Sequence, residues 1–403
     1  MPPASPLPAS AVPLLSLAAF GSGISMRAAD PLLPLLSTEF GVALGEASLA
    51  ITVFSIAYGV AQLGFGPLGD RYGKYLVIAL AALASSATAL LCAAAGSLPV
   101  LLAVRLLAGA TAAAIIPLSM AWIGDVIDYE HRQPVLARFL IGQILGVSAG
   151  VLVGGFAADA HQWRLPFLLV AAIFLLVGLG LLALNRRLPP HATSVRPIAG
   201  SAARHMLAEF GHIAALPWAR LVLLTAFLEG GLLYGPFAFI ASHLHHQHGM
   251  SLARAGAVIM LFGFGGFAFA MGSKAMLARL GEAGLARWGG IVLALSLAAV
   301  GLAPLWWLAM PASFCAGLGF YMLHNTLQTN ATQMAPERRG AAVSAFASCF
   351  FMGQAMGVGV AGLLLACVGT AALLVGGAAG LLAVALHFAR RVRLKQAAGK
   401  AGP

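Results

Sequence analysis

Residues 66–75 read GPLGDRYGKY and place three glycines, Asp70, Arg71 and Lys74 within ten positions. Long apolar runs flank this stretch on both sides, in a chain of 403 residues of which only 9% are charged and 61% are hydrophobic. A soluble globular domain carries roughly a quarter charged residues. The composition therefore excludes an ordinary soluble protein and places the charged stretch in a loop between two membrane spans.

Apolar stretches of about 20 residues, the helix length that crosses a bilayer core, recur along the whole chain. The sequence therefore predicts an all-α protein of the lipid bilayer with twelve transmembrane helices. They are expected near residues 14–36, 47–66, 76–96, 99–121, 137–158, 164–184, 220–241, 253–273, 288–305, 308–329, 341–364 and 369–389.

The basic residues are distributed asymmetrically between the two sides of the membrane. With both termini placed on one side, all but four of the 23 Lys and Arg residues fall in the loops and tails of that side, and the exceptions are Arg27, Arg105, Arg164 and Arg254. Cytoplasmic loops carry such an excess of basic residues. The net charge of +11 therefore orients the chain, with both termini in the cytoplasm, and does not indicate nucleic-acid binding.

A polar stretch rich in arginine and proline interrupts the spans at the middle of the chain and reads as a linker. The two halves also resemble each other, because HRQPVLARFLIGQILGVSAG, from His131, aligns with RRGAAVSAFASCFFMGQAMG, from Arg338. Such an internal repeat is typical of transporters built from two related bundles. The predicted parts are an N-terminal six-helix bundle (1–185), a cytoplasmic linker (186–219), a C-terminal six-helix bundle (220–389) and a basic cytoplasmic tail (390–403).

The opening stretch resembles the signature of the major facilitator superfamily in the loop between spans 2 and 3. The matching pattern is Gly66-x-Leu68-x-Asp70-Arg71-x-Gly73-Lys74. The resemblance implies two pseudo-symmetric six-helix bundles that expose a central site alternately to either side of the membrane.

The resemblance also implies that this loop is a cytoplasmic gate. Asp70 would lie against the positive N-terminal end of span 11, near Gly340. Arg71 or Lys74 would pair with Asp125 at the end of span 4. The predicted gate residues are Gly66, Asp70, Arg71, Gly73, Lys74 and Asp125.

Four charged residues fall inside predicted spans and well away from the span ends, where each costs at least ~2.5–3.5 kcal/mol on insertion scales and so indicates a function. Arg27 and Asp30 are three residues apart and share a helix face. Arg105 is expected at the depth of Asp30, and we expect Glu229 of span 7 within reach of Arg27. We interpret Glu229, Asp30, Arg105 and Arg27 as proton-coupling residues. A static ion pair, or a cationic substrate bound at Glu229, is the alternative.

Two further patterns resemble proton-coupled antiporters of the superfamily. Arg105, Gly109 and Ala113 match an Arg-x-x-x-Gly-x-x-x-Ala pattern, while GVSAGVLVGG in span 5 resembles an antiporter signature in which Val151 replaces the usual proline. Small residues let helices approach closely, so the span 5 glycines have a packing role with or without antiport. These glycines are Gly146, Gly150, Gly154 and Gly155.

Span 10 carries the polar sequence YMLHNTLQTNATQ, in which His324 and Gln328 share one face with Asn325 beside them. Polar side chains at this depth bind substrate or join helices. Because span 10 lines the cavity in the superfamily, we predict substrate contacts from His324, Asn325 and Gln328, with Tyr234 as part of an apolar wall.

The histidines of HLHHQH, from His243 to His248, could ligate a transition metal, but no nearby carboxylate or cysteine completes a site. The four cysteines all lie in apolar runs, where small buried hydrophobes are expected. We therefore predict neither a metal site nor a cofactor.

The favoured function is a secondary active transporter of a bacterial plasma (inner) membrane that exports small organic molecules, such as drugs or metabolites, in exchange for protons. The alternative is a proton-coupled symporter that takes up a small metabolite. A channel also fits the number of spans, but an enzyme would need a catalytic constellation and a membrane sensor a signalling domain, and neither is found. Its partners would be substrate, protons and lipid, and we expect a monomer.

Overall fold

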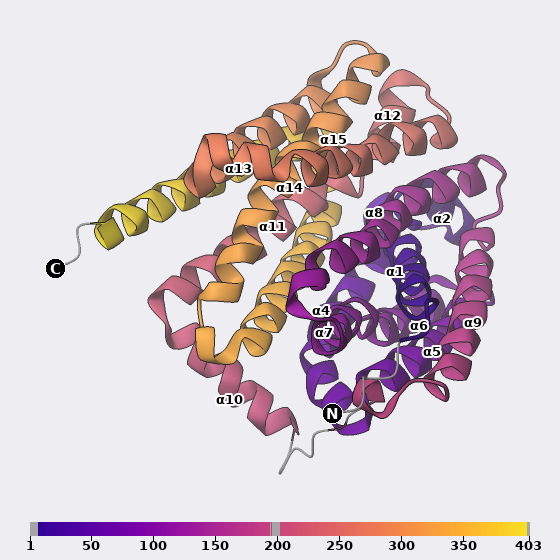
Figure 1. Ribbon diagram of the computed structural model, residues 1–403. Coiled ribbons are helices and arrows are strands. Elements are labelled where there is room, and N and C mark those ends of the chain that lie inside the picture. Colours follow the sequence, from indigo (N-terminus) through magenta and orange to yellow (C-terminus); the bar gives the residue numbers. More distant parts are fainter. Residues whose placement is uncertain (1–6, 194, 196–201, 401–403) are drawn as a thin grey trace.

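The computed structural model describes residues 7–193, 195 and 202–400. In the N-terminal half, Figure 1 shows helices gathered into one bundle, drawn from indigo to magenta. These helices are α1 (Ala11–Arg27), α2 (Leu33–Phe40), α3 (Leu44–Ala47), α4 (Leu49–Tyr72), α5 (Lys74–Ala93), α6 (Leu98–Ala112), α7 (Ile115–Val126), α8 (Tyr129–Asp159) and α9 (Leu165–Asn185).

The C-terminal half forms a second bundle, drawn from rose to yellow in Figure 1. Short 3-10 turns lie at Pro190–Thr193, Trp306–Leu308 and Pro336–Arg338. The α-helices after α9 are α10 (Ala202–Ala215), α11 (Pro217–Phe237), α12 (Ile240–His248), α13 (Leu252–Leu302), α14 (Ala309–Gln333) and α15 (Arg339–Lys400).

The twelve predicted spans map onto these helices in order. Within the described residues, nine helical segments are long and apolar enough to cross a membrane, and α1 is a shorter apolar helix. Two of the nine each contain two spans, because Gly281 in α13 and Gly369 in α15 adopt left-handed φ angles of 66° and 74° at which the helix is interrupted. Glycine accepts this conformation without steric cost.

Three spans are broken in the structure where the sequence predicted continuous helices. Turn residues 28–32 separate α1 from α2, and shorter interruptions separate α6 from α7 and α11 from α12. A proline lies at or beside each break, namely Pro31, Pro117 and Pro236. Proline removes a backbone donor and clashes with the carbonyl four residues earlier. Broken helices in transporters mark the region where ligands and ions bind.

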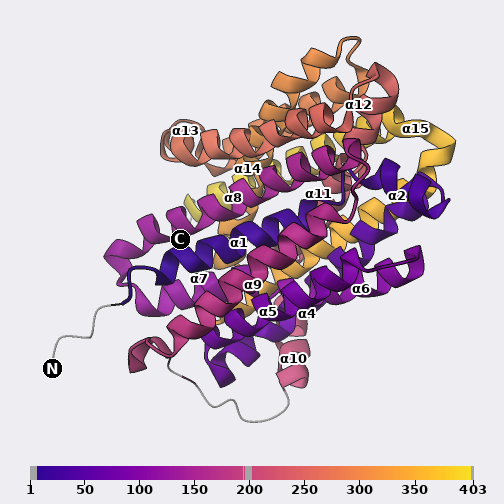
Figure 2. The ribbon, with the colours of Figure 1, turned by 90° about the vertical axis from the view of Figure 1, so that its right-hand side faces the viewer.

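The two bundles meet along two helix pairs, α8 with α13 and α4 with α15. Figure 2 shows α8 running beside α13 across this boundary. One end of the molecule carries residues 66–74, the turn at Pro190–Thr193 and α10, and is called the linker end. The opposite end carries residues 41–48, 159–164 and 249–252 and is called the far end.

The α4–α15 pair is tight toward the far end and diverges toward the linker end. A Cβ atom on Gly59 of α4 would touch Phe351 and Ser348 of α15, and one on Gly45 of α3 would collide with Gly362. Gly66 lies two turns beyond Gly59 on the same face of α4. A Cβ there would meet nothing within 4 Å. Along α4 and α15, the described residues of the two bundles therefore meet toward the far end and diverge toward the linker end.

Candidate functional site

Arg27 and Asp30 lie at the break in the first span, buried to 2% and 1% exposure. An Arg27 Nη1 to Asp30 Oδ2 distance of 3.5 Å makes them an ion pair, although neither Asp30 oxygen accepts a hydrogen bond from any described residue. A buried carboxyl group is tolerated when it is paired with a cation or protonated. This pair thus places an ionisable carboxyl group in the interior of the membrane-spanning region.

Arg27 also reaches across the bundle boundary to the C-terminal half. Its Nη2 donates a hydrogen bond of 3.1 Å to Oε1 of Gln354 on α15. Its guanidinium carbon lies 3.8 Å from the centre of the Tyr234 ring, a cation–π arrangement. Gln354 in turn donates 2.8 Å to Ser55 Oγ on α4. Arg27 is therefore shared between an acid in its own bundle and two uncharged partners in the other.

Glu229 of α11 is fully buried and pairs with His324, whose Nδ1 lies 2.8 Å from Glu229 Oε2. The His324 ring stacks on Phe320 and contacts Phe346 and Phe350. The other Glu229 oxygen, Oε1, accepts no hydrogen bond from the described residues. The result is a second buried acid–base pair, enclosed by aromatic rings in the C-terminal bundle.

Our expectation that Glu229 comes within reach of Arg27 is not met by this structure, in which Arg27 lies on Tyr234. The physical reason is the helical period. Glu229 and Tyr234 are five residues apart, which turns their side chains by about 140° around α11. Tyr234 therefore faces Arg27 of the N-terminal bundle, while Glu229 faces His324 of α14.

Arg105 of α6 is buried to 1% exposure. Its Nε and Nη1 donate 3.1 Å hydrogen bonds to the carbonyl oxygens of Ala50 and Ser25, and its guanidinium lies over the Phe54 ring at 4.1 Å. Asp30 is close enough for an electrostatic attraction. Arg105 thus ties the helix before the first break to α4 and supplies positive charge near Asp30.

The predicted substrate residues have different environments. Tyr234 is buried and contacts Phe237, Phe320 and Phe350. On α14, Asn325 is exposed, while Gln328 is partly buried one turn beyond His324 toward the linker end. The polar face of span 10 therefore leads from the aromatic cluster toward the end where the bundles diverge.

The four glycines of span 5 pack closely on other helices. Cβ atoms on Gly146, Gly150 and Gly154 would meet the backbone of α1 or the turn that follows it, whereas one on Gly155 would meet Leu252 of the other bundle. Val151, in place of a proline, is buried. This helix face thus holds α1, and with it Arg27, against α8.

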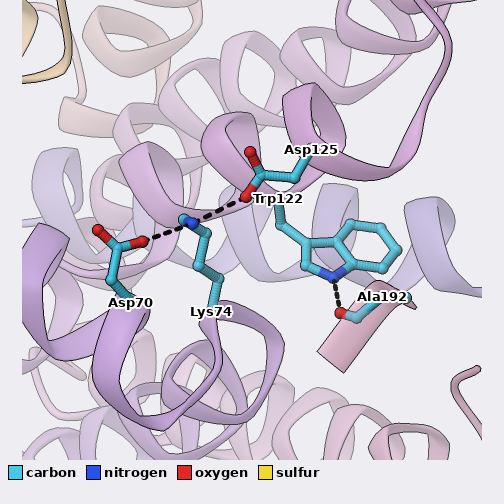
Figure 3. A network of polar contacts seen from close by, with 5 residues as sticks. All are labelled: Asp70, Lys74, Trp122, Asp125 and Ala192. Carbon is cyan, nitrogen blue, oxygen red and sulfur yellow. Dashed lines mark hydrogen bonds and ion pairs between the residues drawn. The ribbon is translucent and has the colours of Figure 1, made fainter. Parts of the chain in front are cut away.

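At the linker end, Lys74 links two acids of the N-terminal bundle. Its Nζ lies 2.6 Å from Asp70 Oδ1 and 2.8 Å from Asp125 Oδ2 (Figure 3). On the next turn of α7, Trp122 donates 2.9 Å to the Ala192 carbonyl and connects this network to the segment after α9. Of the two bases proposed to pair with Asp125, the structure therefore selects Lys74.

The remaining gate contacts differ from the expectation. Arg71 lies 5.3 Å from the ring of its neighbour Tyr72, and Gly73 turns the chain with a φ of 91°. The expected contact of Asp70 with the start of span 11 is not found among the described residues, because Asp70 pairs with Lys74 of its own bundle. The divergence of α4 and α15 at this end is a second reason.

At the far end, one carboxylate joins the bundles directly. Asp159, the last residue of α8, accepts hydrogen bonds of 2.8 and 3.0 Å from the backbone N–H groups of Leu252 and Ala253 in the first turn of α13. A helix N-terminus has unpaired donors and a partial positive charge, which a carboxylate satisfies. Asp159 therefore closes the far end as a helix cap supplied by the other bundle.

The histidines at the far end have separate partners. His243 lies 2.8 Å from Thr370 Oγ1, and His245 lies 2.6 Å from the Met250 carbonyl. Among the described residues, no group of three or more His, Cys, Asp or Glu side chains could hold a metal ion.

Sequence reasoning missed Gln354, Ser55 and Asp159. Gln354 falls within the span 11 repeat GQAMG, where a buried amide next to glycines was the available signal. Asp159 ends an apolar run and resembles a loop residue, and its role depends on a helix far away in the chain. The partners of Gln354 and of Asp159 are therefore not specified by the local sequence.

Two membrane-embedded bundles, closed on each other at one end around buried acid–base pairs, define a secondary transporter. The sequence profile described as Major Facilitator Superfamily matches residues 15–358. The chain therefore belongs to that superfamily and is a multi-pass membrane transporter, not an enzyme.

Individual relatives are distant. The inner membrane transport protein YnfM of Escherichia coli is 25% identical over 58% of this chain and 55% of its own length. The probable efflux pump mfs2 of Aspergillus flavus is 28% identical over 40% of this chain and 38% of its own length. A bacterial homologue of the lysosomal transporter Spinster, solved inward-facing and unoccupied, has a TM-score of 0.68 and 19% identity and covers 94% of both chains.

Proposed function

We propose that this protein exports small organic molecules in exchange for protons by alternating access. The observation that carries the proposal is the pair of buried acids, Asp30 and Glu229, each beside a base and each with a carboxylate oxygen that no described residue bonds. Ionisable groups inside a membrane are costly and mark proton or ion pathways. A purely structural pair would satisfy its oxygens.

The proposed cycle uses both faces of the protein. A proton from outside binds at Asp30 or Glu229, and the far end then closes to give the conformation seen here. The proton leaves through the linker end, a substrate enters by the same route, and the bundles rock back to release it outside. In the outward-open state, residues Gly66 to Lys74 would hold the linker end shut, with Asp70 against the start of α15.

The direction of transport and the substrate class have separate support. Export is supported by the distant relatives named as efflux pumps and by the antiporter-like patterns at Arg105 and in span 5. An apolar substrate with few polar groups is supported by the aromatic rings of Tyr234, Phe320 and Phe350 near Glu229, the buried acid of the C-terminal bundle. We infer a monomer in a bacterial inner membrane, with the linker end in the cytoplasm, because basic residues gather there.

The test is transport by inverted membrane vesicles under an imposed pH gradient, acidic inside. Added substrates, screened among lipophilic dyes, antibiotics, sugars and amino acids, should dissipate the gradient and accumulate inside if the protein is an antiporter. Collapse of the gradient by an ionophore should stop accumulation. Substrate that leaves the acidic lumen together with protons would instead identify the proton-coupled symporter. Transport indifferent to the gradient would overturn proton coupling altogether.

A further inference from the structure

Gln354 uses both the oxygen and the nitrogen of its side-chain amide to bond residues of the opposite bundle. It lies on α15 with no exposed surface, accepts from Arg27 at 3.1 Å and donates to Ser55 at 2.8 Å. An amide cannot change its charge, so Gln354 takes no part in carrying a proton. Its two hydrogen bonds nevertheless cross the boundary at the depth of the Arg27–Asp30 pair.

We propose that Gln354 is the positioning residue that converts the charge of Asp30 into closure of the bundles. The inference rests on the proposed proton coupling. Arg27 has one ionic partner, Asp30, in its own bundle and two uncharged partners, Gln354 and Tyr234, in the other. The guanidinium stays charged in proteins, so its attraction to Asp30 depends on whether that acid is ionised.

The sign of the coupling follows from electrostatics. When Asp30 is ionised, it competes for Arg27 and weakens the hydrogen bond across the boundary. When Asp30 is protonated, that attraction disappears and Arg27 relies on Gln354 and Tyr234, which ties the bundles together. Hydrogen bonds that involve a charged group are the stronger ones, so the tie is sensitive to this competition. Protonation thus favours the closed far end, as an exchanger requires.

Other groups around the pair do not change this sign. Arg105 of α6 faces Asp30, while Tyr234 of α11 and Tyr321 of α14 lie near enough to Arg27 to interact electrostatically. Glu229 of α11 interacts electrostatically with Tyr234. Ser55 of α4, Gly150 of α8 and Gln354 of α15 also approach it and do not titrate. Glu229 is engaged by His324, so Asp30 is the acid that competes for Arg27.

The experiment measures closure of the far end without any substrate. Spin labels at Gln162 and Gln247, both exposed at the far end, report the distance between the bundles in nanodiscs from acid to alkaline pH, in a background without native cysteines. In the unmodified protein, the short-distance fraction should rise in acid. Asp30→Asn, which mimics the protonated acid, should give that short distance at every pH.

Gln354→Met keeps the approximate size of the side chain and removes both hydrogen bonds. It should lower the ratio of closed to open protein in acid by about tenfold or more, the loss expected for a bond to a charged group, and should cancel the effect of Asp30→Asn. Ser55→Ala leaves the Arg27 bond intact and should keep the pH response at a reduced amplitude. The matched control is Gln62→Met, which removes a buried glutamine of α4 instead of the one on α15.

The outcomes separate this inference from the proposed function. If the unmodified protein shows no pH response, proton coupling and the role of Gln354 both fail. If it responds and Gln354→Met responds equally, proton coupling stands and Gln354 is only a packing residue. If Gln354→Met does not fold, the Ser55→Ala series decides, and an unchanged amplitude there contradicts the proposal.

Discussion

The two ends of the molecule hold their helices together by different means. At the far end, backbone meets backbone where Gly45 lies against Gly362, and the Asp159 carboxylate caps a helix of the other bundle. At the linker end, the charges of Asp70, Lys74 and Asp125 are satisfied within one bundle. The second set of contacts therefore does not depend on where the other bundle lies.

This difference shows why a charged signature loop need not cross the bundle boundary in every conformation. Lys74 keeps Asp70 and Asp125 compensated while the bundles are apart. At the linker end, the described contact closest to a crossing is the ion pair of Arg338, just before α15, with Glu209 of α10, a helix that also packs on α4 and α11. The linker thus stays attached to both bundles where they diverge.

The largest expected effect lies between the two ends, at the buried acid of α11. Glu229→Gln should abolish pH-driven transport while expression stays intact, because an amide cannot exchange a proton and His324 loses its charged partner. Transport in inverted vesicles with and without the gradient measures this. Glu282→Gln, at a partly buried acid near the kink of α13, is the control. Unchanged proton coupling in Glu229→Gln would refute its assignment.

A bulky side chain in the far-end contact should have the next largest effect. Gly45→Val places atoms against Gly362, and overpacking of this kind shifts equilibria by roughly ten- to a hundredfold. We expect the closed far end to become rare, with transport reduced to match, as measured by cross-linking of introduced far-end cysteines. Gly376→Val, where a Cβ meets nothing within 4 Å, should leave cross-linking intact. Equal loss in both variants would mean general instability.

Removal of the charge from Asp159 should have a moderate effect. Asn keeps one acceptor oxygen for the N-terminus of α13 but lacks the negative charge that faces it, a contribution of roughly 0.3–1 kcal/mol. Asp159→Asn should therefore reduce the closed population by about two- to fivefold, with a larger difference at low ionic strength. Far-end spin-label distances measure this shift. Asp128→Asn removes an exposed acid at the start of α8 that makes no side-chain cap bond and should change nothing. A wild-type distance distribution in Asp159→Asn would show that the backbone contact alone closes this end.

The smallest effect is expected at Lys74 when the far end is closed. Partly exposed ion pairs contribute about 0–1 kcal/mol, so Lys74→Met should lower the thermal unfolding midpoint by only a few degrees and leave far-end distances unchanged. The exposed Lys274→Met serves as the control. A strong opening of the far end in Lys74→Met would contradict the separation of the two ends drawn here.

The sequence predicted the features that depend on composition and local pattern. Hydropathy predicted the all-α membrane fold with twelve spans, and the loop motif predicted the family that the sequence comparison confirms. The spacing of Arg27 and Asp30 predicted their shared face. A pairing of Arg71 or Lys74 with Asp125 was expected from the family's loop, and in the structure Lys74 forms it.

The features that sequence reasoning missed depend on the rotation and approach of distant helices. No local pattern states that α11 turns Glu229 toward His324 and Tyr234 toward Arg27, or that α15 brings Gln354 between Arg27 and Ser55. The contact of Asp159 with α13 depends on two bundles being closed, which is a property of one conformation. A single sequence encodes more than one.

The contact between Gly45 and Gly362 also bears on whether the protein leaks protons across the membrane. At this contact the main chains touch without side chains between them, which leaves no room there for a chain of water molecules that could conduct protons. A transporter held in this conformation would then conduct no protons through this contact. A variant that leaked protons at this contact would lower the membrane potential available to other processes, even if it still transported its substrate.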